Sequence, residues 1–361
     1  MKQLSIATMY EFKDRFHLFE NRKDIEFFSE IAFAIAEGCW FVDRTNTIQM
    51  PFKTILSDKY TIPDLSNVKP LSLEECCADS ATRLLASNSK LYFLYSGGID
   101  STLALVSFIK AGATRDQLIV VCSPDSIREN PNFYYDHVRM RFNLLSSDSF
   151  IQQMKTRDLN GKVVICEPAD ILVSQCYSGM AFKLFGGDFL TKPATQGNIL
   201  QFLKGRGLSD PIANCCADMH TVNIKYSPRP IVTMYDFFWW AKYNWRWQYQ
   251  GEKLQLRTTF TPDIETFYST LEFQKWGATH TQVEINKISD FKKDYKQIIY
   301  NFTNDKEYFD LKVKHTSVSY LYLADSFVAM EADGTKLKAT DFSLMNYYQE
   351  DNFIADWIRD N

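Results

Sequence analysis

The first half of the chain alternates between short apolar runs and longer stretches with helical spacing. We expect strands at LYFLY (91–95), QLIVVC (117–122) and KVVIC (162–166). Such short, almost purely apolar strands are typical of a parallel sheet that is buried on both faces. Between and after them we expect helices over 101–111, 133–145 and 147–157. This alternation predicts an α/β fold with a doubly wound, mostly parallel sheet.

The segments on either side have different patterns. Residues 1–71 combine a helical pattern at 25–38 with a strand-like run at 39–43, which predicts a small α+β region. Ser72 and Glu75 have the spacing of a capping box, so a helix is expected to begin there. Beyond about residue 200 the chain is helical and rich in aromatic residues. We therefore expect a main domain over 72–345, with a helical C-terminal part, and an acidic tail over 346–361.

The turn after the first expected strand carries unusual chemistry. The sequence KLYFLYSGGIDSTLALVSFIKAG runs from Lys90 to Gly112, and its turn lies at the carboxyl end of a strand, where open parallel sheets bind ligands. Gly97 and Gly98 permit a close approach of the main chain to a ligand. The helix that follows points its free N–H groups at the same place, which suits a phosphate. Hydroxyl donors are added by Ser96, Ser101 and Thr102.

Asp100 contradicts a simple phosphate site, because a carboxylate repels phosphate. The contradiction disappears if Asp100 holds Mg²⁺, which prefers oxygen ligands and bridges carboxylates to phosphates. The sequence has no GxxxxGK[ST] motif, no GxGxxG after a strand, no GxSxG and no HExxH. An ordinary P-loop, a dinucleotide fold, a hydrolase elbow and a zinc protease are therefore not supported.

The run Ser96-Gly97-Gly98-Ile99-Asp100-Ser101 matches the SGGxDS pyrophosphate loop of the N-type ATP pyrophosphatases. The chain resembles the synthetase domain of asparagine synthetases and β-lactam synthetases over about 72–345. This resemblance implies the adenine nucleotide α-hydrolase-like fold, with ATP and Mg²⁺ as cofactors. It also implies that the loop, together with Thr102, binds the pyrophosphate part of ATP.

A second segment supports the resemblance. The family carries a GEGxDE-like sequence after a later strand, and VVICEPADIL supplies Glu167 and Asp170 at corresponding positions, with Cys166, Pro168 and Ile171 as departures. By resemblance, Asp170 is the second Mg²⁺ ligand beside Asp100, and Glu167 is an acid that handles the substrate amine. By resemblance, the nucleobase is expected against the end of the strand at 117–122, which follows the helix of the glycine loop, at Val121, Cys122 and Ser123.

The resemblance implies a ligase that adenylates a carboxylate (or an amide-type oxygen), releases pyrophosphate and then forms an amide with an amine or ammonia. A late lysine is expected near the phosphates, and the candidates are Lys292, Lys293, Lys296, Lys312 and Lys314. Lys312 and Lys314 are favoured as catalytic, because their alternation with apolar residues puts both on one side of a strand-like stretch. The glutaminase domain of asparagine synthetases, with its cysteine after the initiator Met, has no counterpart here. We expect the nitrogen to come from free ammonia, a substrate amine or a separate ammonia-producing protein.

The charge composition limits the classes of partner that we expect the chain to bind. Forty basic and forty-four acidic side chains leave a net charge of −4, which argues against nucleic-acid binding. Two alternatives stay open: a nucleobase- or tRNA-modifying enzyme of the same superfamily, and a non-catalytic module that binds ATP or AMP. The absence of a long apolar run or a signal sequence, with eight dispersed cysteines, predicts a cytoplasmic protein with reduced thiols and no membrane association.

Overall fold

The chain forms two compact units, seen in a computed structural model that describes residues 3–7, 42–47, 53–87, 89–156, 158–252, 254–255, 263–280, 285–312, 328–338 and 347. Unit 1 comprises Met1–Pro63, Cys176–Leu256 and Ser326–Asn361, and unit 2 comprises Asp64–Gln175 and Arg257–Asp325. The expected continuous domain over 72–345 therefore contains parts of both units.

Unit 2 is built on a sheet of five parallel strands. These are β2 (Leu91–Leu94), β3 (Leu118–Cys122), β4 (Asn143–Ser146), β5 (Lys162–Ile165) and β6 (Ile264–Thr266). Their order across the sheet is β4-β3-β2-β5-β6, and every neighbouring pair is parallel. The three predicted strands are confirmed as β2, β3 and β5, and their residues are buried apart from Lys162 and Ile119. The α/β class is therefore confirmed.

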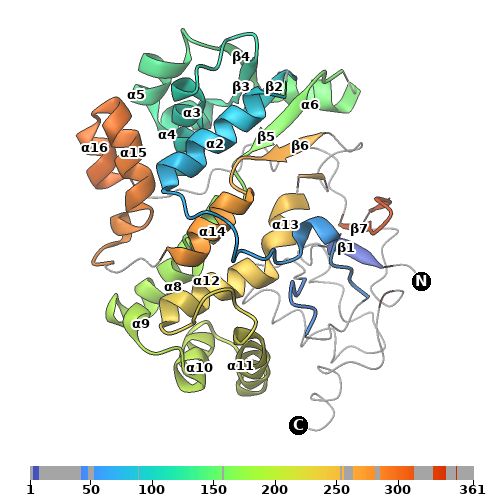
Figure 1. Ribbon diagram of the computed structural model, residues 1–361, viewed down its shortest axis with the longest axis vertical. Coiled ribbons are helices and arrows are strands. Elements are labelled where there is room, and N and C mark those ends of the chain that lie inside the picture. Colours follow the sequence, from blue (N-terminus) through green and yellow to red (C-terminus); the bar gives the residue numbers. More distant parts are fainter. Residues whose placement is uncertain are drawn as a thin grey trace. The chain divides into compact units, whose positions relative to one another are not determined.

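Helices flank this sheet. They are α2 (Leu73–Leu85), α3 (Ile99–Lys110), α4 (Pro124–Glu129), α5 (Pro131–Phe133), α6 (Ser147–Thr156), α7 (Ala169–Leu172), α14 (Leu271–Thr279), α15 (Lys293–Thr303) and α16 (Lys306–Leu311), with a 3₁₀ turn at Ile288–Asp290. The predicted capping box is confirmed, because the Ser72 hydroxyl accepts from the Glu75 N–H while Glu75 accepts from the Ser72 N–H. Figure 1 shows α3 beside α2 and α15, with α16 following α15.

The expected helix over 133–145 is wrong. Tyr134–Val138 forms a π-helical turn, and the chain then turns into β4 at Asn143. Val138 and Phe142 are both buried, so their four-residue spacing resembles a helix face although only the first belongs to a helical turn. β4 is an edge strand whose residues are mostly exposed, and it therefore lacks the apolar signature that revealed the central strands.

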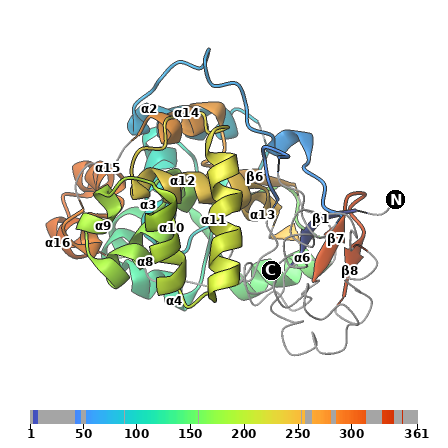
Figure 2. The same ribbon diagram turned by 90° about the horizontal axis from the view of Figure 1, so that it is seen from below.

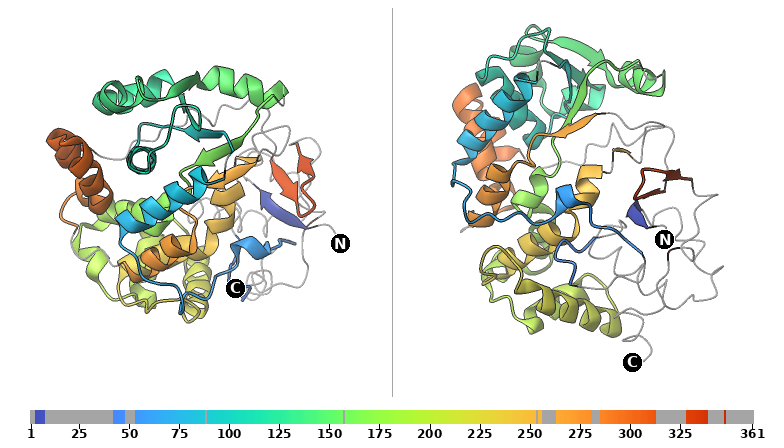
Figure 3. Two further views of the ribbon diagram at one scale, coloured as in Figure 1. Left: turned by 45° about the horizontal axis from the view of Figure 1, so that its top comes forward. Right: turned by 45° about the vertical axis from the view of Figure 1, so that its right-hand side comes forward.

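Unit 1 contains a small antiparallel sheet and a set of helices. The sheet has the order β1-β7-β8, formed by β1 (Leu4–Ala7), β7 (Ala329–Glu331) and β8 (Lys336–Leu337) (Figure 3). The helices are α8 (Gln175–Phe185), α9 (Asp188–Thr191), α10 (Gln196–Gly205), α11 (Asp210–Ile224), α12 (Met234–Trp245) and α13 (Trp247–Glu252), with a 3₁₀ turn at Asp58–Tyr60. α10 and α11 lie side by side in Figure 2.

The aromatic-rich segment forms the centre of unit 1. Every residue of α12 is buried, and Trp239, Trp240 and Trp245 are among the most deeply buried side chains of the described chain. The expected helix at 25–38, residues 39–41 of the expected strand, and the expected tail at 346–361 apart from residue 347 lie outside the described residues. Val42 and Asp43, the described end of the expected strand, do not belong to a strand. Among the helices that the structure describes, none combines the length and the apolar character that a bilayer span requires.

Candidate functional site

The strand order of unit 2 reverses between β2 and β5. From β2 the chain passes through α3 to β3 on one side, whereas β5 and then β6 lie on the other side. Loops that leave the carboxyl ends of two such neighbouring parallel strands diverge, and the crevice between them is the usual ligand site of open α/β sheets. The SGGIDS turn follows β2 and the Glu167–Asp170 segment follows β5. The topology therefore brings both predicted loops to one place.

The turn after β2 requires a glycine. Gly97 has a φ of +73°, and a Cβ added there would lie 2.1 Å from the main-chain oxygen of Ser126 in α4. Ser96 and Ser101 brace the turn from inside, with their hydroxyl oxygens 3.0 Å apart, and the Ser101 hydroxyl donates to the Gly98 carbonyl at 3.1 Å. Gly98 is the N-cap of α3 and has no side chain to accept from the first-turn N–H groups. The positive end of α3 is thus available to an anion.

Two carboxylates, one from each loop, converge on a single ammonium group. Lys292 Nζ donates to Asp100 Oδ1 and, at 2.5 Å, to Asp170 Oδ1. Asp100 lies in the first turn of α3, Asp170 lies in α7, and Lys292 is the N-cap of α15. Two acids separated by seventy residues are therefore close enough to share one cation, as the sequence-based hypothesis requires.

Lys292 holds this position at a conformational cost. Its side chain is 0% exposed, whereas those of Asp100 and Asp170 are 19% and 14% exposed. Its backbone is left-handed, with φ 59° and ψ 30°, a region that non-glycine residues rarely occupy. Outliers of this kind concentrate at functional sites, where the surrounding structure compensates for the strain.

The carboxylates could hold a magnesium ion. Mg²⁺ in phosphate-transfer sites is typically held by one or two carboxylates together with substrate phosphates, and Asp100 and Asp170 provide that set. Within the described chain, no group of three or more His, Cys, Asp or Glu side chains is arranged to hold a metal by itself. A metal here would thus need oxygen ligands from a bound substrate.

Cys166 and Glu167 border the same site. Burial raises the pKa of the Cys166 thiol well above its ordinary value, and the charges of Asp100 and Glu167 raise it further. The thiol therefore stays protonated near neutral pH and is a poor nucleophile. Glu167 is half-buried and follows Cys166 directly, and the charges of both Glu167 and Asp100 act on the Cys166 thiol.

Of the two predicted catalytic lysines, the one that the structure describes, Lys312, bonds to a different acid. Lys312 Nζ bonds to the Glu129 carboxylate at 2.5 Å and to its main-chain oxygen at 2.9 Å, at the end of α4. Lys314 lies outside the described residues. Lys296 donates to the main-chain oxygens of Ser289 and Phe309, and Lys293 is exposed. Of the four candidates that the structure describes, Lys292 is the one that it brings to Asp100 and Asp170. No periodicity in the sequence distinguishes this lysine.

The residues expected to contact a nucleobase have structural roles. The Val121 carbonyl accepts from the Tyr95 N–H at 2.9 Å, within the sheet. The Ser123 side chain caps α4 by accepting from the Ser126 N–H at 3.2 Å, and Cys122 is buried. Thr102 is also buried, and its hydroxyl makes no hydrogen bond to any part of the chain that the structure describes.

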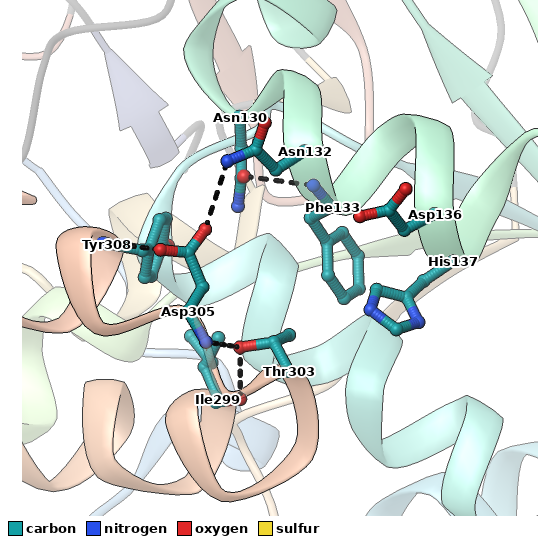
Figure 4. Close-up of a pocket in the computed structure, with 9 residues that line it drawn as sticks. All are labelled: Asn130, Asn132, Phe133, Asp136, His137, Ile299, Thr303, Asp305 and Tyr308. Carbon is teal, nitrogen blue, oxygen red and sulfur yellow. Dashed lines mark hydrogen bonds between the residues drawn. The ribbon is translucent and has the colours of Figure 1, made fainter.

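A shallow pocket of unit 2 lies elsewhere, between the segment after α4 and the α15–α16 turn (Figure 4). Its polar groups largely serve helix ends: Asn130 caps α5, and Asp305 caps α16 while accepting from Asn132 at 3.3 Å. Its lining includes neither of the two acids nor Lys292, so we do not assign the site there.

No family model and no curated protein matches this sequence. The assignment of the site therefore depends on the geometry of the chain's own residues.

Proposed function

We propose that unit 2 is an ATP-dependent ligase domain that cleaves ATP between its α- and β-phosphates, adenylates a carboxylate substrate and passes it to an amine. We further propose that its sheet is the doubly wound, adenine nucleotide α-hydrolase-like sheet that the SGGIDS motif implies. The observation that carries the proposal is the convergence of Asp100 and Asp170 on Lys292, beside a glycine turn and an open helix N-terminus.

In this proposal each group has a distinct task. The first-turn N–H groups of α3 and the main chain around Gly97 bind the departing pyrophosphate, because they supply fixed donors at the positive end of a helix dipole. Lys292 neutralises part of the negative charge that develops on the leaving group. Asp100 and Asp170 would hold Mg²⁺, which supplies charge neutralisation and orientation of the phosphates.

The attack on the activated acid needs a neutral amine. In this proposal Glu167, which follows β5 three residues before Asp170 in the sequence, accepts a proton from the incoming ammonium group. The amine is either ammonia, from solution or from another protein, or a substrate amine. Cys166, Pro168 and Ile171, the residues that depart from the family pattern, are close to Glu167 in the sequence. We therefore expect the amine and acid substrates to differ from those of the proteins that this chain resembles.

The test is pyrophosphate release in the presence of Mg²⁺ and ATP, screened over small carboxylic acids with and without ammonia and primary amines. The wild type is compared with Asp170→Asn, Lys292→Met and the matched control Lys293→Met, which changes an exposed lysine one residue away. We expect the first two variants to lose about a hundredfold or more in rate, as loss of a major electrostatic group does, and the control to retain the wild-type rate.

Two results would contradict the proposal. Wild-type protein that neither binds ATP nor releases pyrophosphate with any tested pair would reject it entirely. Calorimetric binding of ATP without formation of AMP would replace it with the non-catalytic module, for which the altered segment around Glu167 is the supporting observation.

A further inference from the structure

Lys292 is the most completely enclosed charge in the site. Its ammonium group lies on the protein side of the two carboxylates, at 0% exposure, while Asp100 and Asp170 retain some access to solvent. A buried ammonium is tolerated only with opposite charge beside it, and the two acids provide this charge. In return, the lysine keeps two nearby carboxylates from repelling each other.

The same carboxylate oxygens cannot serve two cations without cost. A Mg²⁺ ion bound to Asp100 and Asp170 would lie within a few ångströms of the ammonium group, and at that separation the repulsion in a poorly solvated site is substantial. The trio carries one net negative charge, whereas the acids alone would carry two. A divalent metal therefore binds well only if the ammonium group is given another anion.

We propose that Lys292 is a resident cation that occupies the carboxylate pair in the nucleotide-free protein and excludes free divalent metal until a polyphosphate arrives with it. This inference rests on the proposed function for the identity of that polyphosphate. On binding, the ammonium group would leave the carboxylates for phosphate oxygens, and Asp100 and Asp170 would then be free to hold the metal. Metal and nucleotide then bind together and not in sequence.

Two features of the chain favour this exchange. The four-carbon stem of lysine lets the ammonium group move without a change of main-chain position. The centre of the Tyr295 ring lies 5.6 Å from Lys292 Nζ, so a flat aromatic face that attracts a cation is near the ammonium group. The left-handed backbone at Lys292 fixes the origin of the stem at the start of α15.

The experiment measures Mn²⁺ binding in the absence of nucleotide, by the electron paramagnetic resonance signal of free Mn²⁺. Wild type, Lys292→Met, Lys292→Gln and the control Lys293→Met are titrated. Removal of the buried charge is expected to tighten Mn²⁺ binding by about tenfold or more in both Lys292 variants, and the control is expected to match the wild type. Adding Asp170→Asn to Lys292→Met should abolish the gain. A Lys292 variant that folds only when Mn²⁺ is added would support the same exchange.

The wild type provides an arm that needs no variant. Its Mn²⁺ affinity should be weak alone and should rise at least about tenfold when ATP or inorganic pyrophosphate is present, after subtraction of the Mn²⁺ that each anion binds in a protein-free sample. Wild-type protein that binds Mn²⁺ equally well without either anion would overturn the proposal, as would folded Lys292 variants with no gain. Pyrophosphate release is assayed separately, so a gain in metal binding without any ATP cleavage would retain the resident cation and reject the ligase.

Discussion

The phenolic hydroxyl of Tyr268 donates a 2.8 Å hydrogen bond to the main-chain carbonyl of Asp100. Burial raises the pKa of this phenol, so the hydroxyl remains a donor at all ordinary pH values. The ring stacks on Tyr295 of α15, with centroids 5.9 Å apart and planes 12° from parallel. Tyr268 follows β6 and thus connects the helix that carries Asp100 to the helix that begins after Lys292.

Tyr268→Phe tests whether this connection positions the site. The variant keeps the stacked ring and removes one hydrogen bond, so we expect a loss of about 1 kcal/mol in unfolding free energy. If Tyr268 positions Asp100 and the proposed ligase activity holds, the kcat for pyrophosphate release should also fall about tenfold, with little change in the KM for ATP, because loss of a residue that supports a metal ligand typically costs this much. A variant with lower stability and unchanged kcat would leave Tyr268 a purely structural residue.

Gly97→Ala tests the turn after β2. The added methyl group would meet the Ser126 carbonyl at 2.1 Å, and the φ of +73° is unfavourable for any other residue. Gly112→Ala is the matched control, because Gly112 has a φ of +80° but nothing within 4 Å of the added carbon. We expect the free energy of unfolding of the control to fall by about 1 kcal/mol, because of the backbone conformation alone, and that of Gly97→Ala to fall several times as much. Equal losses in urea unfolding would show that the turn has room to move away from α4.

His220 makes unit 1 sensitive to acid. The imidazole stacks on Trp245 at 4.2 Å between ring centroids, and burial lowers its pKa to about 3. In the unfolded chain His220 takes up a proton near its ordinary pKa of 6.5, whereas in the folded protein it stays neutral down to about pH 3. The unfolding free energy is therefore unaffected by His220 above pH 6.5 and decreases as the pH drops from 6.5 toward 3. His220→Gln cannot titrate, and its unfolding free energy should decline less over this range. Parallel pH profiles for variant and wild type would contradict the assignment.

The titration of Glu252 makes the protein less stable as the pH rises, the opposite of the effect of His220. Burial at the end of α13 raises its pKa to about 7, from an ordinary value of 4.5, and Lys59 lowers it only in part from 3.9 Å. Between these values the folded protein retains a proton that the unfolded chain has released, so the unfolding free energy decreases as the pH rises through this window. Relative to wild type, Glu252→Gln should therefore gain about 3 kcal/mol between pH 4 and pH 8. A constant difference across denaturation curves at several pH values would rule this out.

Sequence reasoning located the two loops because their signal is local. A strand, two glycines and a helix start are adjacent at 91–101, and the acid after β5 stands at a fixed distance from its strand. Which lysine approaches the acids depends on contacts between residues that are distant in the sequence. The alternation of Lys312 with apolar neighbours favours this lysine, but its partner is Glu129. The packing of α15 on α3 brings Lys292 to Asp100 instead.

In the sheet of unit 2, the two strands that the sequence pattern does not reveal lie at the edges. β4 and β6 are short and only partly buried, so they carry few of the apolar residues that mark a central strand. The strand order, and with it the crevice between β2 and β5, depends on these pairings. Periodicity along the chain cannot supply them.

The discontinuity of unit 2 has a consequence for biosynthesis. Asp100 and Asp170 leave the ribosome more than a hundred residues before Lys292, and β6 also follows the whole 176–256 segment. During that interval the nascent chain carries two neighbouring acids without their ammonium partner and a sheet without its last strand. A chain released before residue 292 would keep the glycine turn and both acids but would lack the lysine that joins them.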